Sequence, residues 1–190
     1  AATVRVLARN GCEVHTPQDT KCCGMPAAGY GDVELVRDLA RHNIDLFERY
    51  PADVILTDCA TCGSTLKKYG ALLAGDPAYA ERAQAFSAQV RDISEFLMSI
   101  DLRAPKGQVA ARVTYHDPCH LVRGQKIKAQ PRALLRLVPG LEFVEMKEAD
   151  WCCGSAGTQL ITHYTNSLKV NRRKMDNVRA TGADFVTTGC

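Results

Sequence analysis

Residues 22–24 are Cys-Cys-Gly and residues 59–62 are Cys-Ala-Thr-Cys, and the pattern recurs as Cys-Cys-Gly at residues 152–154 with Cys190 at the end. The two Cys-Cys-Gly segments lie 130 positions apart. A vicinal thiol pair with more distant cysteines gathers soft sulfur ligands, which suit soft metal centres. The pattern therefore predicts a duplicated fold with one cysteine-lined metal site in each copy.

The duplication extends beyond the cysteines. Residues 52–59, Ala-Asp-Val-Ile-Leu-Thr-Asp-Cys, align with residues 183–190, Ala-Asp-Phe-Val-Thr-Thr-Gly-Cys, at an offset of 131. Self-similarity at a fixed offset indicates a tandem repeat. In this alignment the counterpart of Cys119 would precede residue 1 and the counterpart of Cys62 would follow residue 190, so we expect a piece of a longer protein.

The chain has nine cysteines, and eight of them fall into the two sets. Cys12 aligns with Glu142, which is not a soft ligand, so we expect Cys12 to be dispensable for metal binding. Four thiolates suit a structural zinc ion, but a vicinal pair is unusual for zinc and favours an iron–sulfur centre. The candidate ligands are Cys22, Cys23, Cys59 and Cys62 in the first copy, and Cys119, Cys152, Cys153 and Cys190 in the second.

Composition argues against several other classes of protein. The net charge is only +3 and the two signs are interspersed, so nothing favours nucleic-acid binding. No apolar run approaches the length of a membrane span, and no Ser-His-Asp set, phosphate loop or paired-carboxylate spacing stands out. Cysteines in duplicated motifs favour metal ligation over disulfides, and we expect a cytoplasmic protein.

Hydrophobic periodicity places the first cysteine set on alternating helices and strands. Residues 32–49 carry apolar side chains at helical spacing, and Asp32 is placed to cap the start of this helix. Residues 53–57 form a short apolar run that is typical of a strand. After Cys59 we expect one helix through residue 72, a long helix whose apolar face includes residues 86–100, and a linker over residues 101–108.

The second copy repeats the alternation. We expect an α/β fold with two duplicated open, largely parallel sheet units and flanking helices, with domain bounds of 1–104 and 109–190. Ligands bind at the carboxyl edge of such a sheet, so we expect its four cysteine sulfurs to converge there on a common point. The predicted strands cover residues 109–115, 141–146 and 184–188, and the predicted helices cover residues 131–138 and 165–180.

The order of these motifs resembles the cysteine-rich CCG domain family. That family includes the catalytic subunit of heterodisulfide reductase and the iron–sulfur subunits of glycolate oxidase, lactate-utilisation and anaerobic glycerol-3-phosphate dehydrogenase complexes. Residues 152–158 and 66–79 most resemble the glycolate oxidase iron–sulfur subunit. The resemblance implies 4Fe–4S clusters, a separate flavoprotein subunit that oxidises a 2-hydroxy acid, and a quinone or other acceptor.

Two function classes remain open from the sequence. In the first, the chain is an electron-transfer subunit of an oxidoreductase, associated with a membrane only through its partners. In the second, it is a heterodisulfide reductase-like catalytic module that cleaves a disulfide at a cluster, because Cys59 and Cys62 complete a first-copy set that several glycolate oxidase subunits lack. A structural zinc module is the further alternative, above all for the first copy.

Overall fold

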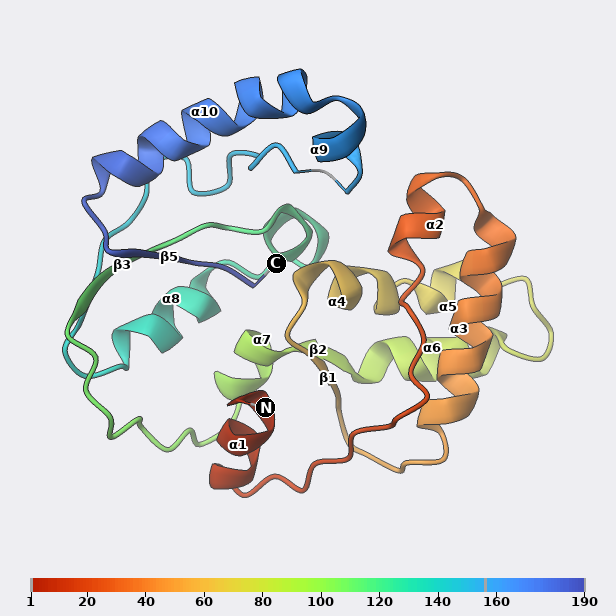
Figure 1. Ribbon diagram of the computed structural model, residues 1–190. Coiled ribbons are helices and arrows are strands. Elements are labelled where there is room, and N and C mark those ends of the chain that lie inside the picture. Colours follow the sequence, from red (N-terminus) through yellow and green to blue (C-terminus); the bar gives the residue numbers. More distant parts are fainter. Residues whose placement is uncertain (1, 156, 190) are drawn as a thin grey trace. The chain divides into compact units, whose positions relative to one another are not determined.

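A computed structural model describes residues 2–155 and 157–189 of the chain (Figure 1). The chain divides into two compact units, residues 1–103 and residues 104–190. Each unit has its own parallel sheet: two strands in the order β1-β2 in unit 1, and three strands in the order β4-β3-β5 in unit 2. The expected α/β class with parallel sheets and flanking helices is confirmed.

Unit 1 is mostly helical. Asp32 caps the helix predicted over residues 32–49, because its carboxylate accepts a hydrogen bond from the Leu35 N–H at 3.1 Å. The elements are α1 Ala2–Arg9, α2 Met25–Gly29, α3 Val33–Phe47, β1 Ile55–Thr57, α4 Ala60–Leu66, α5 Tyr69–Leu72, α6 Ala80–Gln89, β2 Val90–Asp92 and α7 Ile93–Leu97.

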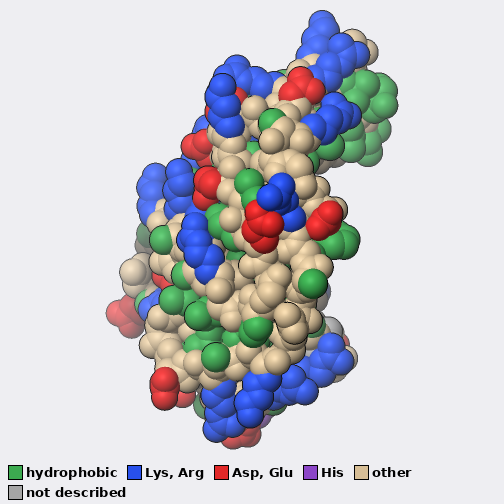
Figure 2. Space-filling model, turned by 90° about the vertical axis from the view of Figure 1, so that its left-hand side faces the viewer, with side chains coloured by type: hydrophobic (Ala, Val, Ile, Leu, Met, Phe, Trp, Pro, Cys, Tyr) green, Lys and Arg blue, Asp and Glu red, His purple; other side chains and the backbone are tan. Residues whose placement is uncertain are grey.

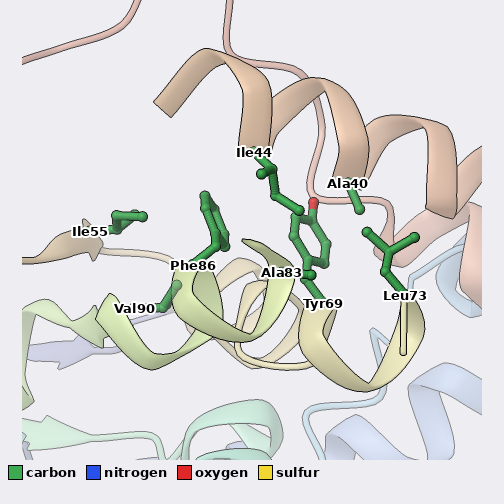
Figure 3. Packing of buried hydrophobic residues seen from close by; sticks show 8 residues of the cluster. All are labelled: Ala40, Ile44, Ile55, Tyr69, Leu73, Ala83, Phe86 and Val90. Carbon is green, nitrogen blue, oxygen red and sulfur yellow. The ribbon is translucent and has the colours of Figure 1, made fainter. Parts of the chain in front are cut away.

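The core of unit 1 forms where α3, α5 and α6 meet β1 and β2. Figure 3 shows the Tyr69 ring between Ile44 and Leu73, with its hydroxyl directed toward α3. The Tyr69 and Phe86 rings stack with centroids 5.5 Å apart. Ile55 and Val90 extend this core to the two strands, which pair in register at these two residues.

The prediction of one long helix over residues 86–100 is wrong. The chain leaves α6 at Gln89, and β-branched Val90 is fully buried as it pairs with β1. Asp92 and Glu95 then form a capping box that starts α7: the Asp92 carboxylate accepts from the Ser94 N–H at 2.8 Å, and the Glu95 side chain accepts from the Asp92 N–H. Sheet pairing and this cap outweigh the helical spacing of the apolar residues. The single helix expected up to residue 72 is likewise divided into α4 and α5.

Unit 2 matches the predicted alternation more closely. β3 lies between β4 and β5, and all three strands are parallel, so their carboxyl ends share one edge. A short π-helix at His120–Gly124 and the short α9 were not predicted. The elements are β3 Ala111–Tyr115, α8 Ala129–Arg136, β4 Leu141–Phe143, α9 Gln159–Thr162, α10 Tyr164–Ala180 and β5 Phe185–Thr187.

The surface carries charged side chains of both signs. On the face shown in Figure 2, Lys and Arg side chains form several groups, one of them along the bottom, and Asp and Glu side chains are scattered between them. Within the part of the chain that the structure describes, no helix combines the length and the apolar character that crossing a membrane requires.

Candidate metal centre

In unit 1, β1 and α4 position two of the cysteines. β1 ends at Thr57, whose hydroxyl accepts a hydrogen bond from the Cys59 N–H at 3.1 Å. Cys59 is the N-cap residue of α4, and Cys62 lies in its first turn. This is the predicted arrangement, in which a strand delivers the chain to a cysteine at its carboxyl end.

The thiols of the first set lie near one another. Cys23 and Cys62 are close enough to shift each other's pKa, and Cys22 acts in the same way on Cys23, as Cys59 does on Cys62. The Cys62 thiol lowers the pKa of Cys23, which burial opposes, whereas the Cys23 thiol and burial raise the pKa of Cys62. Two segments that are distant in the sequence therefore bring these thiols into one neighbourhood.

The backbone of the first cysteine pair is held by two buried side chains. The Tyr69 hydroxyl donates to the Cys23 carbonyl at 3.0 Å, and the Asn43 amide donates to the Tyr69 oxygen at 3.2 Å. Asn43 also donates to the carbonyls of Lys21 and Cys22 at 3.3 and 3.4 Å and accepts from the Lys21 N–H at 3.0 Å. Burial raises the pKa of Tyr69, so this hydroxyl keeps its proton.

The two Cys-Cys-Gly turns have the same local geometry. Gly24 and Gly154 have φ angles of +92° and +86°. Their N–H groups donate to the sulfurs of Cys22 and Cys152 at 3.5 and 3.3 Å. A Cβ atom at Gly154 would lie 2.5 Å from the backbone oxygen of Ser167, so only glycine fits this close approach in the left-handed region.

In unit 2, hydrogen bonds join the segments that carry the second set. The Asp117 N–H donates to the Ala149 carbonyl at 2.9 Å, which ties the segment before Cys119 to the one before Cys152. The His116 N–H donates to the Thr187 carbonyl at 2.9 Å, at the end of β5. The structure thus brings these three segments together at the carboxyl edge of the sheet.

A buried ion pair fixes the segment before Cys119. The Arg132 guanidinium donates to both carboxylate oxygens of Asp117, at 2.7 and 2.9 Å, and to Glu145 from its other edge. The Asp117 side chain is 1% exposed, so a fixed bidentate partner is needed to keep its charge buried. The hydrogen bonds that Arg132 donates to Glu145 and Asp117 raise its pKa further above its already high value.

Cys119 and Cys152 are exposed and Cys153 is half-buried, so their thiols are accessible. Cys190 lies outside the described residues. Over residues 2–155 and 157–189, no three His, Cys, Asp or Glu side chains already surround one point as a metal cage would. Convergence of each cysteine set on a common point therefore stays a prediction.

The described donors fit a soft metal centre. The neighbouring thiols can be deprotonated to thiolates, and N–H groups of Gly24 and Gly154 point at sulfur, as protein N–H groups do around iron–sulfur clusters. Four thiols alone would also suit zinc. The eight described cysteines are free thiols, which leaves them available as ligands.

The supporting residues Asn43, Tyr69, Arg132 and Asp117 were missed by sequence reasoning. Asn43 gave one usable signal, because a polar residue interrupts the apolar face of the helix predicted over residues 32–49. The other three gave none, since their roles depend on contacts between distant segments.

The comparisons with known proteins agree with this site. The model of a family described as cysteine-rich domain (CCG) matches residues 1–67 and 113–190. The chain is 38% identical over its whole length to the probable glycolate oxidase iron-sulfur subunit of Bacillus subtilis (strain 168), covering 44% of that protein. It is 40% identical over its whole length to a subunit of the fumarate reductase (CoM/CoB) of Methanothermobacter marburgensis, covering 36% of it.

A third relative is covered more completely. Lactate utilization protein A of Geobacillus sp. (strain WCH70) is 32% identical over 97% of this chain, and the alignment spans 77% of that protein. The chain spans less than half the length of the first two relatives. With both cysteine units matched and the fold as expected, the chain belongs to the CCG cysteine-rich domain family.

Proposed function

We propose that each cysteine set binds an iron–sulfur cluster of the 4Fe–4S type. The observation that carries this proposal is the pair of equivalent N–H to sulfur bonds at the two Cys-Cys-Gly turns, together with the proximity of the thiols in unit 1. The names of the relatives from Bacillus subtilis and Methanothermobacter marburgensis support it, because both are subunits of redox enzymes. A bound cluster would supply one-electron transfer. The proposed ligands are Cys22, Cys23, Cys59 and Cys62 in unit 1, and Cys119, Cys152, Cys153 and Cys190 in unit 2.

The test is metal analysis of the full-length protein. After anaerobic purification, iron and acid-labile sulfide should be present together, and the visible spectrum should bleach with dithionite. Cys23→Ser and Cys153→Ser should each remove part of the iron, and the double variant should remove more. A colourless protein that holds stoichiometric zinc in either unit would overturn the proposal for that unit.

We further propose that the chain is the electron-transfer part of a flavin-linked oxidoreductase acting on a 2-hydroxy acid such as glycolate or lactate. Similarity to the glycolate oxidase and lactate utilization proteins supports this role. A flavoprotein partner would oxidise the acid, and this chain would carry the electrons toward a quinone or another acceptor. The proposed location is the cytoplasm, with any membrane contact made through partners.

The partner experiment separates this role from catalysis. The clusters of the full-length protein should become reduced when the flavoprotein partner receives the 2-hydroxy acid, and the protein alone should not turn over the acid. Reduction that is independent of the partner would contradict the proposal.

A second candidate is a heterodisulfide reductase-like module that cleaves a disulfide at a cluster. It is favoured by the complete four-cysteine set of unit 1 and by the 40% identity to a protein whose name includes CoM/CoB. If the cluster-loaded protein reduces a disulfide with an artificial electron donor and no flavoprotein, this candidate replaces the first.

A further inference from the structure

One face of α10 holds the second Cys-Cys-Gly segment through polar side chains. Ser167 donates to the Gly154 carbonyl at 2.7 Å, and Asn171 donates to the Cys153 carbonyl at 2.9 Å. Lys174 lies on the same face, because positions 167, 171 and 174 are separated by about one helical turn each. Figure 1 shows α10 running along this segment.

Lys174 extends this support with a buried charge. The residue is 3% exposed, and its Nζ donates to the carbonyls of Glu148 and Ala149 at 2.9 Å each and to the Met146 sulfur at 3.7 Å. A neutral amine has only two N–H donors, whereas an ammonium has three. Three acceptors around Nζ therefore indicate the charged form. Burial lowers the pKa of Lys174, and nearby anionic groups oppose that effect, first Asp117 and then Asp150, Cys153 and Glu148.

Two of the three carboxylates near Lys174 are engaged by other cations, and the third is that of Asp150. Asp117 is paired with Arg132 through both oxygens, and Glu148 with Arg173. Neither carboxylate is a hydrogen-bond partner of Nζ, whose acceptors are two carbonyls and a thioether. The ammonium thus lies behind the cysteine pair with no anion hydrogen-bonded to it.

Unit 1 places a neutral residue at the equivalent position. At an offset of 131, positions 167, 171 and 174 correspond to Val36, Ala40 and Asn43 of α3. A Cβ atom at Gly24 would meet the Val36 side chain and one at Gly154 would meet the Ser167 backbone, so the corresponding residues lie beside the two turns. The uncharged amide of Asn43 donates to the carbonyls of Lys21 and Cys22. Within residues 2–103, the buried charged side chain is Asp92, an anion.

We infer that Lys174 is a positioning residue of the second cysteine site, and that its buried charge gives the unit 2 cluster a more positive reduction potential than the unit 1 cluster. This inference rests on the proposed function. Reduction adds a negative charge, and a fixed cation nearby stabilises that charge most strongly where water is excluded. The unit 2 cluster would then be the stronger electron acceptor of the two.

The experiment is a mediated potentiometric titration of the full-length, cluster-loaded protein, followed by electron paramagnetic resonance. Cys23→Ser leaves the unit 2 site to be titrated alone, and Cys153→Ser leaves the unit 1 site. In the Cys23→Ser background, Lys174→Gln should shift the one-electron equilibrium at least tenfold toward the oxidised cluster, which is about 59 mV. Lys169→Gln, the same charge change at an exposed position of α10, should shift it far less.

A charge-conserving variant separates electrostatics from structure. Lys174→Arg should keep the potential near that of the unmodified protein; a shift equal to that of Lys174→Gln would show a purely structural role and overturn the inference. If Lys174→Gln does not fold, the reduction potentials of the Cys23→Ser and Cys153→Ser variants are compared instead. A more positive potential for the unit 1 cluster would overturn the inference and leave the proposed function intact. Absence of iron and sulfide from the unmodified protein would overturn the proposed function and the inference with it.

Discussion

Substitution of Gly154 tests the close approach between the second Cys-Cys-Gly turn and α10. The φ angle of Gly154 is +86°, and a Cβ atom there would lie 2.5 Å from the Ser167 backbone oxygen and 3.3 Å from the Asn171 nitrogen. A non-glycine residue in the left-handed region costs about 1–2 kcal/mol, and forcing extra volume into a packed site costs about 1–3 kcal/mol. Because backbone atoms cannot rotate away, Gly154→Ala should lower the free energy of unfolding by about 3 kcal/mol.

Two control variants divide this cost into its parts. Gly157 has a φ of +62°, and a Cβ atom added there would meet nothing within 4 Å, so Gly157→Ala should lose only about 1 kcal/mol. Gly24→Ala would meet the Val36 side chain at 2.9 Å, which can adjust, so its loss should lie between the other two.

Urea unfolding followed by circular dichroism measures all three variants, with equal slopes confirming that only stability has changed. The Gly154 variant should also bind less iron, because the Cys152 and Cys153 backbone would have to move away from α10. Equal losses for Gly154→Ala and Gly157→Ala would refute the reasoning, since the contact with Ser167 would then contribute nothing.

Three further predictions concern the ion pair, the ninth cysteine and acid stability. Arg132→Met leaves a buried carboxylate unpaired and should lower the free energy of unfolding, measured in urea, by about 3–5 kcal/mol. Arg82→Met removes a more exposed pair and should lower it by at most about 1 kcal/mol, and similar losses for the two variants would contradict this. Cys12→Ser should leave the iron content unchanged while Cys153→Ser lowers it, and equal losses would show that the repeat alignment is misleading. The bond from Arg173 lowers the pKa of Glu148 from 4.5 to about 2, so its stabilising effect is present above pH 4.5 and lost as the pH falls toward 2. Melting curves of Glu148→Gln should therefore show a weaker pH dependence in that window, and parallel curves would count against the ion pair.

Local patterns predicted much of the fold. The cap at Asp32, the strand before Cys59 and the strand and helix order of unit 2 follow from hydrophobic period and turn residues, which act over a few positions. β2 could not be predicted this way. Its residues have helical spacing, and they form a strand because Val90 pairs with Ile55, a partner far away in the chain.

For the candidate site, too, some features follow from the sequence and others from tertiary contacts. The sequence by itself determined the duplication, the two cysteine sets and the expectation that Cys12 is dispensable, because a repeat aligns residues without reference to their contacts. It also determined which strands precede which cysteines. These features are properties of order and spacing along the chain, and they do not depend on tertiary contacts.

The tertiary structure alone decided how the two halves differ. Lys174 belongs to a helix whose sequence is rich in charged residues, and nothing in its spacing distinguishes it from exposed Lys169. Its burial follows from the packing of α10 on the segment that begins at Met146, and the contact of Gly154 with Ser167 fixes how close that packing is. Such contacts depend on which face of a helix meets a distant loop, and that choice is made by the sum of many non-local interactions rather than by any local pattern.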